Sequence, residues 1–156
     1  MIRSTLKGAC FGLTSGIITT LGMIIGLSSF TGSKEVVIGG ILTIAIADSF
    51  SDALGIHISE ESSNQNHKEV WIATLATFIS KLIFSSMFIL PVILFKLDIA
   101  IIISVLWGLL LLGILSYYIA KDKKEKPFSV ITEHIFIAII VIIATHYAGK
   151  MINHLF

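Results

Sequence analysis

Five long apolar segments alternate with short polar segments along the chain. The apolar segments cover residues 8–30, 36–58, 71–95, 99–120 and 128–149. A helix needs about 20 mostly apolar residues to cross about 30 Å of hydrocarbon, and each segment is long enough. The pattern therefore predicts an all-α polytopic membrane protein with five transmembrane helices. We expect a single membrane domain over residues 1–156, because the loops are too short to hold another domain.

The composition supports this interpretation against a bundle of short buried helices in a soluble protein. Hydrophobic residues make up 55% of the 156 residues and charged residues 13%. A soluble domain has about 45–50% apolar and about 25% charged residues. The mean hydropathy of +0.95 argues against a disordered segment, and the net charge of +1 provides no basic surface for a nucleic acid. The single cysteine, Cys10, excludes an internal disulfide.

The distribution of basic residues in the loops predicts the orientation, because cytoplasmic loops are enriched in Lys and Arg. With the N-terminus inside, the inner loops hold seven basic residues and the outer loops three. The inner set is Arg3, Lys7, Lys68, Lys121, Lys123, Lys124 and Lys126; the outer set is Lys34, Lys96 and Lys150. We therefore expect the N-terminus inside and the C-terminus outside, in what we take to be a prokaryotic cell membrane.

Two aspartates inside the second apolar segment are the strongest candidates for a functional site. Asp48 and Asp52 are four residues apart, so they lie on one helix face. Ionisable groups within a membrane are costly, and they usually have a partner or a function. Three arrangements would relieve the repulsion between the two carboxylates: a bound divalent cation, a shared proton, or a structural salt bridge to Lys81. Of the three, we favour a cation pathway with Asp48 and Asp52 as metal ligands.

Other polar groups at a similar expected depth extend the predicted ion pathway. At about 1.5 Å per residue, Lys81 and Glu133 fall in the same half of the membrane as the aspartates. On the first helix Ser15, Thr19 and Met23 form a stripe at four-residue spacing. Their hydroxyl and thioether groups are candidates for lining an ion path. Alternatively, the two hydroxyls only bond carbonyls of the preceding turn.

Two further groups of residues have both a functional and a structural interpretation. His57, Glu60 and Glu61 are candidates for a cytosolic entrance that gathers cations, or they simply form a solvated helix end. Glycines at four-residue spacing allow close approach of a second helix, either within one chain or across a dimer. These glycines are Gly8, Gly12 and Gly16, with Gly22 and Gly26 repeating the spacing.

Two segments carry a resemblance to a known family. Residues 12–26 read GLTSGIITTLGMIIG and residues 45–62 read AIADSFSDALGIHISEES. These segments resemble the first and second helices of the vacuolar iron transporter family, whose five-helix plan the chain also follows. Ser15 corresponds to the family's aspartate on the first helix, Asp52 to its methionine on the second and Ile56 to its following glutamate. The chain resembles a short member that lacks the family's cytosolic metal-binding insert.

The resemblance implies transport of Fe²⁺ or Mn²⁺ out of the cytosol, by proton antiport with alternating access at the interface of a homodimer. The divalent cation would be the substrate, no other cofactor is expected, and the chain would not be an enzyme. One alternative is a non-transporting membrane scaffold or assembly protein with a structural Asp–Lys pair. A more remote one is a Mg²⁺-dependent membrane enzyme, because the same DxxxD spacing occurs in prenyltransferases.

Overall fold

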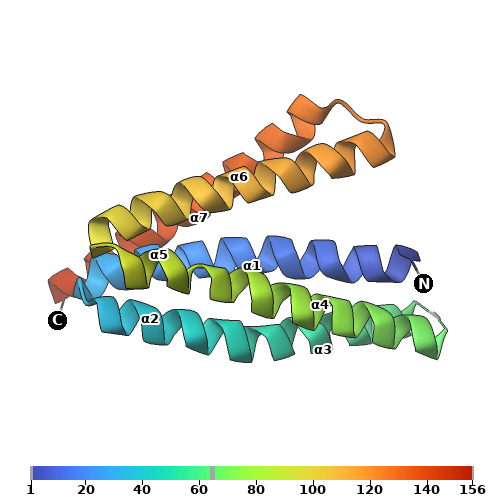
Figure 1. Cartoon of the computed structure of the whole chain (residues 1–156), viewed down its shortest axis with the longest axis horizontal. Coiled ribbons are helices and arrows are strands. Elements are labelled where there is room, and N and C mark those ends of the chain that lie inside the picture. The colour runs from blue at the N-terminus through green and yellow to red at the C-terminus, as the bar shows by residue number, and fades with distance from the viewer. Residues whose placement is uncertain (1, 64–65, 156) are drawn as a thin grey trace. The chain divides into compact units, whose positions relative to one another are not determined.

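The computed structural model describes residues 2–63 and 66–155, which are helical with short connections and contain no strand. Figure 1 shows the helices in chain order. Their bounds are α1 Ile2–Thr31, α2 Lys34–Thr43, the π-helix η1 Ile44–Asp48, α3 Ser49–Ser62, α4 His67–Met87, α5 Ile89–Leu94, α6 Leu97–Lys123 and α7 Pro127–Leu155.

Among the described residues, five helical stretches are long and apolar enough to cross a membrane, which confirms the all-α class and the number of predicted spans. They cover Ile2–Thr31, Lys34–Ser62, His67–Leu94, Leu97–Lys123 and Pro127–Leu155. Every stretch is longer than the apolar segment that predicted it, because polar residues beside that segment continue the helix. The polar connection expected at residues 59–70 is shorter for the same reason, and residues 64 and 65 within it lie outside the described residues. The orientation of the termini and the single domain remain predictions.

The outer faces of the helices are apolar. On η1 and α3 the exposed side chains include Ile46, Phe50, Leu54 and Ile58, at four-residue spacing. Side chains at this spacing form one stripe along a helix. Such a stripe is unfavourable in water and favourable in lipid, so the exposed surface is that of an integral membrane protein.

The helix ends follow from local backbone chemistry. Gly32 adopts a positive φ of 62°, and its amide donates to the Ser28 carbonyl, which ends α1. The third stretch is interrupted at Phe88, between α4 and α5. Pro91 explains this position, because a proline cannot donate to the carbonyl four residues before it, and Met87 is the last residue of α4. Pro127 begins α7, where the missing N–H has no helical partner to lose.

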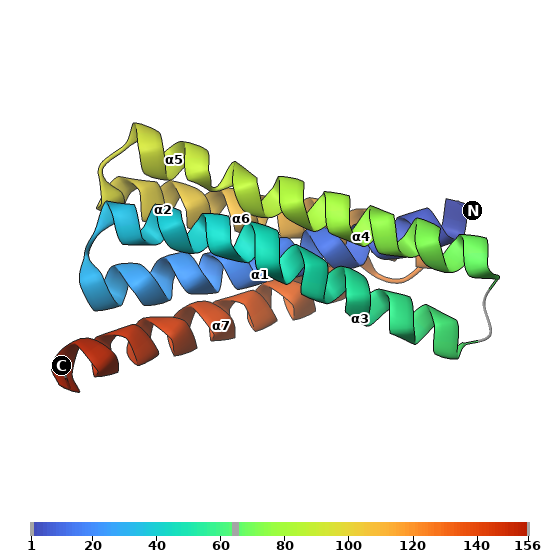
Figure 2. The same ribbon diagram turned by 90° about the horizontal axis from the view of Figure 1, so that it is seen from below.

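The chain forms two compact units, and each is described by itself. The first contains residues 1–20 and 41–88; the second contains residues 21–40 and 89–156. In the first unit α4 lies beside α3 (Figure 1 and Figure 2). In the second unit α6 packs on α7, and Gly22 and Gly26 of α1 face Thr145 of α7.

Candidate functional site: a lysine shared by two aspartates

Lys81 is the centre of the candidate site, and its side chain is 0% exposed. It lies on α4 in the first unit, where its ammonium contacts the carboxylates of both Asp48 and Asp52. The distance from Nζ to Asp52 Oδ2 is 2.5 Å. The ammonium also donates to the Ser15 hydroxyl at 2.8 Å. One lysine therefore connects α1, η1, α3 and α4.

The two carboxylates are only partly buried. The Asp48 side chain is 32% exposed and that of Asp52 is 18% exposed. Each carboxylate therefore has one side toward Lys81 and another side open. With three ionised groups the cluster carries one positive and two negative charges, a net charge of −1.

A π-helical turn carries Asp48. The segment η1 ends at Asp48, and α3 starts at the next residue. A π-turn inserts one residue into the α-helical hydrogen-bond pattern, and such turns are frequent at functional sites. The buried Ser49 hydroxyl donates to the Ala45 carbonyl at 2.5 Å, which satisfies a backbone acceptor within this turn.

The glycines of the first helix explain how Ser15 reaches the lysine. A Cβ atom added at Gly12 would collide with the carbonyl of Thr77, and one at Gly8 with the carbonyl of Ala73, both on α4. At Gly16 it would lie 3.3 Å from the Lys81 carbonyl. The three glycines thus let α1 approach α4 closely within one chain.

The open side of the carboxylates is bordered by small residues of the same helix. Ser51, Gly55 and Ser59 are exposed, and they follow Asp48 by three, seven and eleven residues. At these spacings they lie on the face of Asp48. A Cβ added at Gly55 would meet no atom within 4 Å. A search for ionisable groups does not identify these residues, because none of them is ionisable. Their spacing from Asp48 is the sequence feature that indicates them.

The remaining predicted pathway residues are described within their own units. The Thr19 hydroxyl donates to the Ser15 carbonyl at 2.8 Å, the back-bonding of an ordinary membrane helix. Met23 belongs to the second unit, where it faces Gly40 of α2. Glu133 is exposed on α7, also in the second unit.

The three predicted entrance residues have different environments. His57 shares a 2.9 Å hydrogen bond with the Thr74 hydroxyl, and Glu61 is exposed. Glu60 is buried and forms a salt bridge with Lys7, a pairing across 53 residues that no sequence pattern indicated. Among the described residues, no group of three or more His, Cys, Asp or Glu side chains is arranged to hold a metal ion.

Comparison with protein-family models gives no match, and comparison with curated proteins gives no significant match. The resemblance to the vacuolar iron transporter family therefore remains an expectation from the two sequence segments. The candidate site rests on its own geometry: a membrane lysine shared by two aspartates.

Proposed function

We propose that the chain is a membrane transporter for a divalent metal cation, with Asp48 and Asp52 as the ligands. The observation that carries this proposal is the imbalance of the cluster, in which two carboxylates share one ammonium. A structural ion pair needs only one aspartate. The second carboxylate adds a negative charge within a membrane span, where its cost is about 2.5–3.5 kcal/mol.

A divalent cation fits the chemistry of the two side chains. Carboxylate oxygens suit Mg²⁺, Mn²⁺ and Fe²⁺, and these ions accept water and hydroxyl oxygens in their remaining positions. The open side beside Gly55 supplies an approach to the carboxylates that does not pass through Lys81. Ser51 and Ser59 supply hydroxyl oxygens along that approach.

Lys81 then acts as a tethered competitor of the transported ion. A divalent cation together with the ammonium would leave one excess positive charge on two carboxylates. The ammonium must therefore withdraw from the aspartates when the metal binds, and it returns when the metal leaves. Protons compete as well, because carboxylates must be ionised to bind metal. Export from the cytosol, proton antiport and the homodimer follow from the family resemblance and belong to the same proposal.

One observation favours a second candidate, a scaffold without transport. The ammonium of Lys81 contacts three helices and is completely buried, which is what a structural clamp requires. In a scaffold the two aspartates would be fixed partners of Lys81, and no ion would visit them.

The first experiment measures transport. The purified chain is reconstituted into vesicles that contain a Mn²⁺-sensitive dye, and the rate of Mn²⁺ uptake is recorded. We expect Asp48→Asn with Asp52→Asn to reduce the rate to that of empty vesicles. Asp98→Asn, which removes an exposed carboxylate in the first turn of α6, is the matched control and retains the rate. Undiminished uptake in the double variant would refute the proposed ligands.

The second experiment separates transport from a scaffold role. Exchanging the charges, with Asp52→Lys and Lys81→Asp, retains one lysine and two aspartates but moves the second carboxylate from α3 to α4, so that Asp48 and Asp52 no longer form a pair on one helix face. Both roles predict that the exchanged variant keeps its stability. A transporter takes up Mn²⁺ as the wild type and loses this uptake in the exchanged variant, whereas a scaffold takes up no Mn²⁺ in either form. Wild-type protein that is folded and shows no uptake of any divalent cation would favour the scaffold.

A further inference from the structure

An apolar groove runs along α6 in the second unit. Its volume is about 690 Å³. The lining includes Leu106, Leu110, Gly113, Tyr117 and Tyr118 of α6 and Ile135 of α7. These residues belong to the second unit, and the groove is described within that unit alone.

Gly113 keeps the groove open. A Cβ added at this position would meet no atom within 4 Å, so the glycine is not needed for helix packing. Gly22 of the same unit differs, because a Cβ there would lie 3.0 Å from Val141. The missing side chain at Gly113 therefore leaves space that a ligand can occupy.

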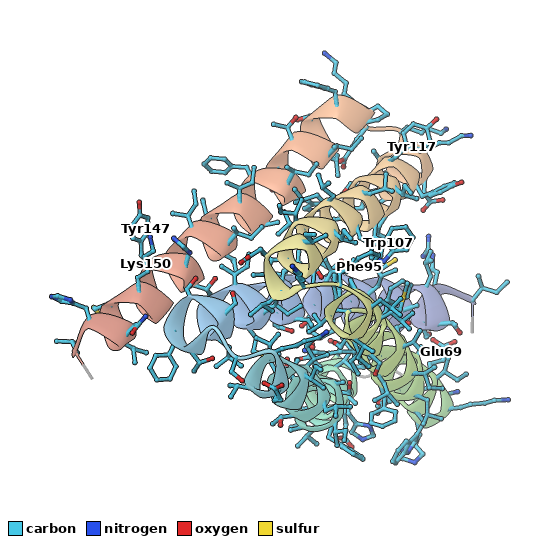
Figure 3. All side chains as sticks on the ribbon, turned by 60° about the vertical axis from the view of Figure 1, so that its left-hand side comes forward. Glu69, Phe95, Trp107, Tyr117, Tyr147 and Lys150 are labelled. Atoms are coloured by element: carbon cyan, nitrogen blue, oxygen red, sulfur yellow. The ribbon has the colours of Figure 1, made fainter. Side chains whose placement is uncertain are left out.

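One end of the groove is positively charged. Tyr117 and Tyr118 lie on the last turns of α6, before the connection to α7, and Figure 3 shows Tyr117 near this end of α6. Four exposed lysines and two exposed acidic residues follow, giving a local charge of +2; they are Lys121, Lys123, Lys124, Lys126, Asp122 and Glu125. Lys124 adopts a left-handed conformation with φ of 57°, which ends the helix within the basic run.

The length of the groove matches one leaflet of a bilayer. Leu106 and Tyr118 are twelve residues apart, which corresponds to about 18 Å along a helix. Half of the hydrocarbon thickness is about 15 Å. Tyrosines prefer the headgroup level, and clusters of lysine next to a membrane helix attract anionic lipids. Along α6, each part of the surface thus matches one part of a phospholipid: the apolar groove matches the acyl chain, the tyrosines the interface and the lysines the phosphate.

We propose that this groove binds an anionic phospholipid, with one acyl chain over Gly113 and the phosphate among the lysines. The charge of the basic run selects an anionic headgroup over a zwitterionic one. The groove holds one acyl chain of the lipid. The lipid therefore stays bound during purification.

Native mass spectrometry of the whole chain tests the proposal. The delipidated protein is mixed in detergent with equal amounts of phosphatidylglycerol and phosphatidylcholine that carry identical acyl chains. We expect one bound phosphatidylglycerol to predominate. Changing Lys121 and Lys124 to Gln lowers its preference over phosphatidylcholine by about fivefold for each lysine. The matched control changes Lys96 and Lys150, two exposed lysines elsewhere in the second unit, and leaves the preference unchanged.

The groove is tested separately from the charge. Gly113→Leu fills the open space and reduces the bound lipid of both kinds by tenfold or more. Gly39→Leu is its control, because a Cβ at Gly39 also meets no atom within 4 Å. Ile114→Trp fills the same groove from a lipid-exposed position and replaces Gly113→Leu if that variant does not fold.

Three results would overturn the proposal. Equal binding of the two lipids by the wild-type chain excludes selection by charge. Lipid binding that is unchanged by both groove-filling variants shows that the lysines act without the groove. A dimer that excludes lipid and dissociates in Gly113→Leu shows that a second copy of the chain occupies the groove.

Discussion

Replacing Lys81 by methionine is the sharpest perturbation of the candidate site. Methionine has a similar length and a similar helix propensity, so the change removes the ammonium and little else. The variant loses the contacts to Asp48 and Asp52 and the hydrogen bond to Ser15. Two carboxylates then lie on one helix face with no positive partner.

The expected loss of stability follows from burial. Removing one partner of a buried ion pair costs about 3–5 kcal/mol, because the remaining charge is left uncompensated. Asp48 is 32% exposed and Asp52 18% exposed, which places the expected cost toward the lower end, about 3 kcal/mol. Adding Asp48→Asn and Asp52→Asn to Lys81→Met should recover most of this loss, because no charge then remains to be compensated.

The measurement is the free energy of unfolding in mixed micelles with increasing dodecyl sulfate at pH 7. Divalent metal adds a second, sharper readout. In Lys81→Met the carboxylates no longer have a competing ammonium, so Mn²⁺ should stabilise this variant more than the wild type. At a free concentration of 100 times the dissociation constant the gain is about 2.7 kcal/mol.

Two outcomes would refute this reasoning. A loss below about 1 kcal/mol, comparable with that of Lys96→Met at an exposed site, would show that the ammonium does not compensate the aspartates. A loss near 3 kcal/mol without any effect of Mn²⁺ would leave the clamp intact and remove the support for a metal site.

Three further predictions concern other contacts of the first unit. Gly12→Val should destabilise the protein by about 1–3 kcal/mol, because its Cβ collides with the Thr77 carbonyl, whereas Gly113→Ala should not; both are measured by unfolding in dodecyl sulfate. Lys7→Met should cost about 1–2 kcal/mol, because it leaves the buried Glu60 unpaired while Lys7 itself is 58% exposed, and Lys7→Met with Glu60→Gln should recover the loss. Gly55→Phe should reduce Mn²⁺ uptake without loss of stability, since it fills the open side of the carboxylates; equal uptake would remove that side from the pathway.

The five helices could be predicted because the membrane imposes one length and one composition on every span. The positions at which the helices end were harder to predict, because capping residues and polar extensions determine them. The break at Phe88 follows from Pro91, but its position needs the geometry of the carbonyl four residues earlier. The π-turn that ends at Asp48 has no marker in the local sequence, because residues 44–47 have the composition of any apolar helix interior.

The candidate site could be predicted in part from the sequence. The spacing of Asp48 and Asp52 predicted one face, and their expected depth pointed to Lys81 as a partner. The pattern could not indicate that one ammonium contacts both carboxylates, because this depends on how closely α1, α3 and α4 approach. That approach depends on Gly8, Gly12 and Gly16, whose spacing alone did not distinguish packing within one chain from packing between two.

The short Lys81–aspartate contacts do not by themselves decide between a clamp and a transporter, because both functions need a cation beside the carboxylates. The number of charges is more informative. A structural ion pair with Lys81 needs only one aspartate. A scaffold protein would be more stable in lipid with an uncharged side chain in place of the other. The first unit instead retains both, with the more exposed carboxylate, Asp48, on the face that Ser51 and Gly55 leave open. A second negative charge in that position is what the proposed transport needs, because a mobile cation or proton would compensate it.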